Sequence, residues 1–157
     1  MTDDAQMLAK RCAEALWADD ATAHHLGMAI VAVEPGAARI SVTVTSAMVN
    51  GYGVCHGGYI FTLAGTALSI ASQSRNRRSL AQNCQIAFIA PAHRGMTLIA
   101  EARERYTAER SGIWDVTVRA VTGRTIAELR GHVRHPTGVI VDASDGSQSA
   151  GSPGVMS

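Results

Sequence analysis

One segment constrains the fold more than any other: residues 57–73 contain no proline and are apolar around most of a helix. The segment opens at His56-Gly57-Gly58 and ends near Gln73. Its apolar residues at helical spacing are Ile60, Phe61, Leu63, Ala64, Ala67, Leu68, Ile70 and Ala71. A helix that is apolar on most sides is buried on most sides. The rest of the chain must therefore wrap around it.

The residues on either side of this helix predict that the wrapping layer is a sheet. Residues 28–33 and 39–45 form apolar or alternating runs about a Pro35-Gly36 turn, which predicts a hairpin. Four more strands follow, of which the last is expected to close the sheet: residues 80–90, 97–107, 113–120 and 125–135. Strands joined in sequence by short links are antiparallel. We therefore expect an α+β fold, a five- to six-stranded antiparallel sheet wrapped around one long central helix.

The two ends of the chain lie outside this expected domain of residues 20–136. Residues 1–19 predict an N-terminal helix that is capped by Asp3 or Asp4. The apolar stripe of this helix is predicted at Leu8, Cys12, Ala15 and Leu16. Residues 137–157 are rich in Gly, Ser and Asp and predict a flexible tail.

Charge and cysteine content exclude several classes of protein. The 14 Lys and Arg residues nearly balance 13 Asp and Glu, which argues against binding nucleic acid through bulk charge. No apolar run has the length of a membrane span, and the N-terminus lacks a signal pattern. Cys12, Cys55 and Cys84 have neither disulfide nor zinc spacing. We expect a cytoplasmic protein with no cofactor, no metal ion and no membrane or nucleic-acid partner.

The loop from Asn50-Gly51 to His56-Gly57-Gly58 is the densest candidate for chemistry. It leads directly into the central helix, where unpaired backbone N–H groups and a partial positive charge are expected. Glycines allow a substrate to approach that backbone closely, so the turn could hold a phosphate or a developing oxyanion. The alternative is that the glycines only form a sharp turn. Spacing alone favours neither reading.

The helix also carries polar residues on one face: Thr62, Thr66, Ser69 and Gln73. They predict a wet face or an interface, or else hydroxyls that bond back to the preceding turn. Gly65 lies beside them. A glycine inside a helix costs about 1 kcal/mol relative to alanine, so something other than helix stability accounts for it.

The block Asn50-Gly51 to His56-Gly57-Gly58, followed by Phe61-Thr62-Leu63-Ala64 and by residues 86–92, resembles the PaaI-type acyl-CoA thioesterases of the hotdog-fold superfamily. The resemblance covers roughly residues 20–136. It implies a long helix wrapped by an antiparallel sheet and the hydrolysis of phenylacetyl-CoA, or a related aryl- or acyl-CoA, in phenylacetate degradation. It also implies a dimer that pairs into a tetramer, with sites at the subunit interfaces.

The resemblance assigns roles to four positions. Gly57 matches the glycine whose N–H polarises the thioester carbonyl, His56 the histidine that helps to hold the turn, and Asn50 the asparagine near the attacking water. The family has an aspartate, as general base or nucleophile, where this chain has Gly65 before Thr66. Thr66 can position water but cannot accept its proton.

Loss of that acid predicts impaired hydrolysis. An oxyanion site at Gly57 would survive, but losing a general base commonly costs about 10² to 10⁴ in rate. No Asp or Glu lies within residues 35–100, so no neighbour in sequence replaces it. The remaining candidates for a base are His56 and, from a partner subunit, Glu101 or Asp115.

Basic residues suggest where coenzyme A is held. Residues 35–100 contain five arginines and no carboxylate, a charge of +5 that suits an anionic coenzyme A ester. The residues predicted to bind substrate are Gly58, Arg75, Arg77 and Arg78. The alternative for each arginine is a solvated loop. A further group is interpreted as edge-strand solubility, with a metal or phosphate site as its alternative: His132, Arg134 and His135.

Four functions fit these patterns to different degrees. The first is an acyl-CoA thioesterase that is weakened by Gly65, and the second is a non-catalytic acyl-CoA-binding hotdog protein. A dehydratase on the same fold is disfavoured because no acid lies near His56. A purely structural interaction protein is the residual alternative.

Overall fold

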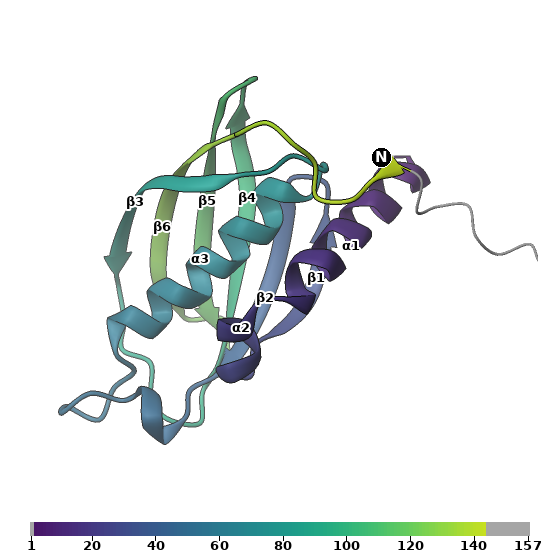
Figure 1. Ribbon diagram of the computed structural model, residues 1–157. Helices are drawn as coiled ribbons and strands as arrows, with labels where there is room; N and C mark the ends of the chain where they lie inside the picture. The colour runs from purple at the N-terminus through teal and green to yellow at the C-terminus, as the bar shows by residue number, and fades with distance from the viewer. Residues whose placement is uncertain (1, 144–157) are drawn as a thin grey trace, which may run out of the picture.

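The computed structural model describes residues 2–143 and contains one curved sheet with a long helix across its concave face (Figure 1). The helices are α1 (Asp3–Ala18), α2 (Ala21–His25) and α3 (Gly57–Gln73), with a short 3-10 turn at Ser46–Met48. The strands are β1 (Ala29–Glu34), β2 (Ala37–Thr43), β3 (Leu80–Phe88), β4 (Thr97–Thr107), β5 (Ser111–Ala120) and β6 (Thr125–Arg134).

The sheet has six antiparallel strands in the order β1-β2-β4-β5-β6-β3. This confirms the predicted α+β fold with one long central helix. The expectation that residues 125–135 close the sheet is wrong, because β6 lies between β5 and β3. The chain crosses the concave face along α3 before β3 begins, so β3 pairs with the free side of β6 and forms the edge itself.

The sheet-facing side of α3 is closely packed. A Cβ atom on Gly131 of β6 would lie 2.5 Å from Cδ2 of Leu68, so the helix rests almost directly on the strand backbone there. Leu63 and Leu68 of α3 are fully buried with Val116 of β5. The opposite side of the helix is open: Phe61 is 38% exposed and Ser69 is exposed. The helix is therefore not buried all round, and one long side of it is uncovered.

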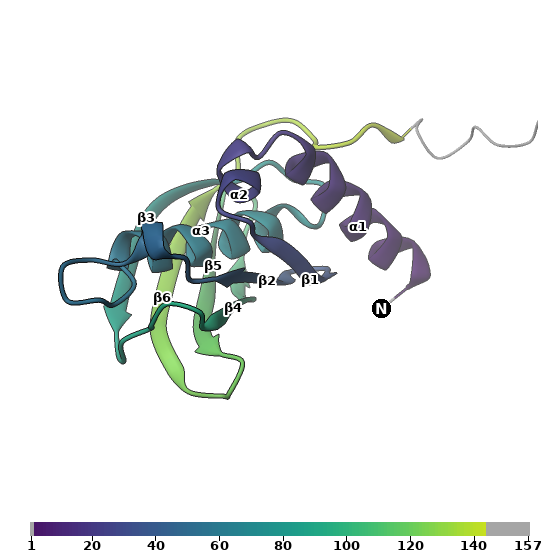
Figure 2. The same cartoon turned by 90° about the horizontal axis from the view of Figure 1, so that it is seen from below.

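The N-terminal helix differs in detail from its prediction. Thr2, rather than Asp3 or Asp4, is the cap, and its hydroxyl accepts the N–H of Ala5 over 3.3 Å. The two aspartates instead lie in the first turn, where the helix dipole stabilises negative charge. Ala15 is exposed, and the buried face consists of Ala9, Cys12 and Ala13. Figure 2 shows α1 beside β1, at the opposite side of the molecule from β3.

The start of the segment predicted as a flexible tail runs along the end of α3. Asn76, in the left-handed region at φ 60°, accepts the N–H groups of Ile140 and Val141 at 2.8 and 2.9 Å. Its amide nitrogen donates to the carbonyl of Val141. Residues 144–157 of the predicted tail lie outside the described residues.

Candidate active site

His56 forms the N-cap of α3. Its Nδ1 accepts the N–H of Gly58 over 3.0 Å, while its backbone carbonyl accepts the N–H of Tyr59. Accepting this bond requires an unprotonated Nδ1, so the ring hydrogen lies on Nε2. The imidazole is otherwise exposed. The first turn of the helix is therefore held by a side chain that keeps one ring nitrogen facing water.

Gly57 is the first residue of α3 and offers a free amide. Within residues 2–143 its N–H has no hydrogen-bond acceptor, whereas the N–H of Gly58 is occupied by His56. An open depression of about 350 Å³ adjoins it. The depression is lined by Val54, Cys55, Gly57, Ile60, Phe88, Ile89, Ala90, Pro91 and Ala92. A free N–H at a helix N-terminus beside an apolar hollow can stabilise negative charge that develops on a bound carbonyl oxygen.

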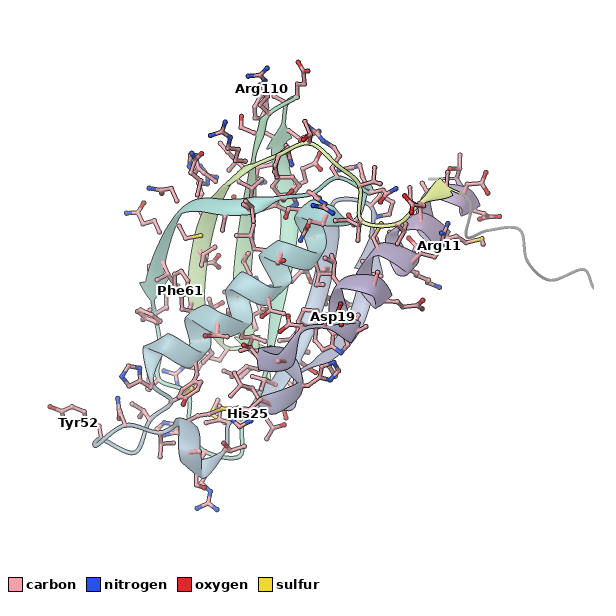
Figure 3. All side chains as sticks on the ribbon, in the orientation of Figure 1. Arg11, Asp19, His25, Tyr52, Phe61 and Arg110 are labelled. Atoms are coloured by element: carbon pink, nitrogen blue, oxygen red, sulfur yellow. The ribbon has the colours of Figure 1, made fainter. Side chains whose placement is uncertain are left out.

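Asn50 folds the loop that leads to this turn. Its Oδ1 accepts the N–H groups of Tyr52 and Val54 at 2.9 and 3.4 Å, and its own N–H donates to the carbonyl of Val54. Among the described residues its Nδ2 has no acceptor, so it remains available to a water molecule. Tyr52 projects from the tip of the loop and is 93% exposed (Figure 3).

Gly65 lies on the open side of α3. A Cβ atom placed on it would meet nothing within 4 Å. Thr66 and Thr62 do not extend into this space, because their hydroxyls donate to the carbonyls of Thr62 and Gly58 at 2.8 and 2.9 Å. Position 65 therefore has room for a larger side chain but carries no functional group.

Gly65 is eight positions after Gly57 in α3. With a rise of 1.5 Å per residue, the two positions lie roughly 12 Å apart along the helix axis. One thioester group cannot contact both positions of the same helix. A site that uses both must be built from two copies of the chain.

Comparisons with known proteins identify the family of this chain. Residues 52–135 match the family model described as the thioesterase superfamily. The chain belongs to that superfamily. It is 36% identical to the acyl-coenzyme A thioesterase PaaI of Escherichia coli over 128 residues, which cover 82% of this chain and 91% of the relative.

Two solved structures resemble this one. The structure of the Escherichia coli PaaI protein matches with a TM-score of 0.84 at 34% identity, and the match covers 85% of this chain and 97% of that one. A Streptococcus mutans protein with bound acetyl CoA matches with a TM-score of 0.68 at 26% identity, and the match covers 71% and 90%. The fold is the hotdog fold, as in the Escherichia coli PaaI protein.

The arginines predicted to bind coenzyme A lie just beyond the C-terminal end of α3, whereas Gly57 is at its N-terminal end. Arg75 pairs with Glu104. Arg77 donates to the carbonyls of Ala108 and Glu109, and Arg78 donates to the carbonyl of Val139 over 3.2 Å. These contacts fasten the β4–β5 hairpin and the C-terminal segment to the end of α3. A role in substrate binding stays a prediction for all three residues.

Glu101 and Asp115, the two acids considered as substitutes from a partner subunit, lie on the outer face of the sheet. Their neighbours along the strands, such as Ala102 and Val116, are buried against α3, so the two carboxylates point the other way. Hydrogen bonds from Arg130 lower the pKa of Asp115 below its ordinary value. Both acids are thus separated from Gly57 of their own chain by the sheet.

The basic residues near the end of β6 do not lie on an edge strand, so that account of them is wrong. His132 and Arg134 are exposed, whereas His135 is buried with its Nδ1 2.9 Å from Oγ of Ser79. Within residues 2–143, no three His, Cys, Asp or Glu side chains gather as metal ligands would. In that part of the chain, no helix is long and apolar enough to cross a membrane.

Proposed function

We propose that this protein binds acyl-CoA thioesters and hydrolyses them slowly, with the thioester carbonyl at the N–H of Gly57. The observation that carries the proposal is the amide of Gly57, which has no acceptor within residues 2–143 and adjoins an apolar depression at the start of α3. The Escherichia coli relative is named an acyl-coenzyme A thioesterase, and the Streptococcus mutans neighbour was solved with acetyl CoA, which supports coenzyme A as the carrier. Phenylacetyl and other apolar acyl groups suit the lining of the depression.

The reaction needs few parts. The carbonyl oxygen accepts the N–H of Gly57, which polarises the carbonyl carbon and stabilises the oxyanion that forms. A water oriented by Nδ2 of Asn50 attacks that carbon and the C–S bond breaks. Of the two protons that the water loses, one goes to the departing coenzyme A thiolate and the other to solvent, which leaves the acid as its carboxylate. His56 contributes by holding the turn through Gly58.

The complete site requires a second copy of the chain. If two α3 helices run antiparallel about a two-fold axis that passes near position 61, position 65 of one lies beside Gly57 of the other, which removes the separation of roughly 12 Å. The surface available for such contact is the open side of α3 together with the edge of β3. It exposes large apolar side chains at Phe61, Leu80, Phe88 and Ile89. We propose a homodimer formed through this surface, which pairs further into a tetramer.

The proposed enzyme lacks a general base at Gly65. No proton acceptor projects from it, and the space around it is empty. A missing general base commonly lowers a rate by about 10² to 10⁴, whereas an oxyanion site remains useful without it. The same observation favours the second candidate, a non-catalytic acyl-CoA-binding hotdog protein.

One comparison of variants distinguishes the two candidates. Phenylacetyl-CoA hydrolysis is measured for the wild type, for Gly65→Asp, and for Ser69→Asp, which adds a carboxylate one turn further along the same face. We expect Gly65→Asp to raise kcat by about 10²-fold or more and Ser69→Asp to leave it unchanged. If Gly65→Asp gains nothing while both chains bind the thioester, the protein is a binding module. A monomer in light scattering would contradict the two-chain site.

A further inference from the structure

Aromatic side chains are scarce in this protein, and both phenylalanines lie at exposed positions. The chain has only two, Phe61 and Phe88, which are 38% and 54% exposed. Trp114 is the large aromatic ring that the core does bury, and burial of further rings would stabilise it. Both phenylalanine rings lie on the surface proposed for the dimer contact, and the Phe88 ring also reaches the candidate site at Gly57.

The ring of Phe88 lies against the first turn of α3. A Cβ atom built on Gly57 would be 2.9, 3.1 and 3.4 Å from Cζ, Cε1 and Cε2 of Phe88. The ring thus contacts the residue that carries the free amide. Any substituent that follows a carbonyl held by this amide must lie close to the ring.

The backbone holds Phe88 in place. Phe88 is the last residue of β3 and pairs with Ala127 of β6. The N–H groups of Ile89 and Ala90 both donate to the carbonyl of Ile126, at 2.8 and 3.2 Å. The ring therefore projects from a strand end that is fixed on both sides of it.

The hollow that Phe88 borders is suited to one kind of acyl group. None of the nine residues that line it carries a charge, and its volume of about 350 Å³ is that of a small ligand pocket. A charged acyl terminus would lose its hydration there without gaining a partner. An aromatic group could pack edge-to-face or offset against the Phe88 ring, as aromatic pairs prefer.

We infer that Phe88 is the residue that selects the acyl group: the depression that its ring and the first turn of α3 both border takes an uncharged acyl moiety and prefers an aromatic one. This rests on the proposed function, since it requires the thioester carbonyl at Gly57. Phe88 acts on specificity, and the amide of Gly57 remains the group that polarises the carbonyl.

The test uses non-hydrolysable thioethers, so that it does not depend on catalysis. Calorimetry compares S-(2-phenylethyl)-CoA, S-butyl-CoA, S-(carboxypropyl)-CoA and free coenzyme A for the wild type, Phe88→Leu and Phe88→Ala. Tyr106→Ala serves as the matched control, because Tyr106 of β4 is 58% exposed and does not line the hollow. Light scattering and thermal unfolding check that each variant keeps its assembly and fold.

We expect the wild type to bind the phenylethyl thioether most tightly and the carboxypropyl one no better than free coenzyme A. Phe88→Ala should weaken phenylethyl binding about tenfold without changing the affinity for free coenzyme A. Phe88→Leu should lose the aromatic preference but keep butyl binding, and Tyr106→Ala should match the wild type. An unchanged phenylethyl-to-butyl ratio in Phe88→Leu and Phe88→Ala overturns the inference alone. A wild type that binds neither thioethers nor coenzyme A overturns the proposed function with it.

Discussion

The imidazole of His56 accepts the N–H of Gly58 over 3.0 Å, whereas the amide of Gly57 has no acceptor in the described part of the chain. Two adjacent glycines thus have different roles, and a side chain decides which amide a substrate can reach. The division follows from cap geometry, since the side chain of an N-cap residue reaches the N–H of the second or third helical residue and not of the first.

His56→Ala should therefore loosen the turn and release a second amide. We expect a loss of about 0.5–2 kcal/mol in the free energy of unfolding, as for other N-cap deletions, together with a lower kcat/KM. Urea unfolding and hydrolysis assays measure the two effects. His56→Asn is the matched control, because an asparagine oxygen is a good N-cap and should restore the stability. An alanine variant as stable as the wild type would show that the cap is not what holds the turn.

The contact between Gly57 and Phe88 makes a second prediction. In Gly57→Ala the new methyl group would lie 2.9 Å from the ring, so the ring or the helix start must move. We expect a cost of about 1–3 kcal/mol in the free energy of unfolding, the usual range for overpacking. In the Phe88→Leu background the same substitution should cost less, because the smaller side chain leaves room.

A double-mutant cycle by urea unfolding measures this coupling. Gly51→Ala is the control, since a Cβ there meets nothing within 4 Å and the change should be nearly neutral. Equal costs of Gly57→Ala in the two backgrounds would mean that the Phe88 ring is not the obstacle.

Much of this architecture could be predicted from the sequence, because it depends on local patterns. The strand at Thr97–Thr107 and the helix that ends at Gln73 have the predicted limits, since alternation and helical spacing are properties of neighbouring residues. The place of β3 at the edge was missed because it depends on where α3 delivers the chain, which no local pattern encodes.

Of the candidate site, only the loop before α3 and the missing acid at position 65 could be predicted from the sequence. The glycines before α3 stand out in sequence, and the absence of an acid at Gly65 is visible there too. The contact between Phe88 and Gly57 cannot be seen in the sequence, because the two residues come from separate elements and meet only after the helix packs on the sheet. The Thr2 cap was overlooked beside two aspartates, since all three residues are good capping types.

His135 makes the stability of the fold depend on pH. Its imidazole is buried beside Ser79, and its pKa is lowered below the ordinary value, first by this burial and then by the nearby charge of Arg77. The carbonyl of Arg78 and the carboxylate of Glu104 act in the opposite direction but do not cancel the effect. The folded protein therefore resists protonation that the unfolded chain accepts near pH 6.5.

The unfolded state then binds more protons than the folded state below about pH 6.5, so the free energy of unfolding should fall as the pH is lowered from there toward the folded-state pKa. Above that pH the contribution is constant. Urea titrations at pH 7.5 and pH 5.5 should show a smaller drop for His135→Gln than for the wild type, whatever the variant loses in packing against Trp114. His132→Gln removes an exposed histidine from β6, three residues before His135, and should keep the wild-type drop. If His135→Gln and His132→Gln have the same pH dependence as the wild type, the buried imidazole is not the group that titrates.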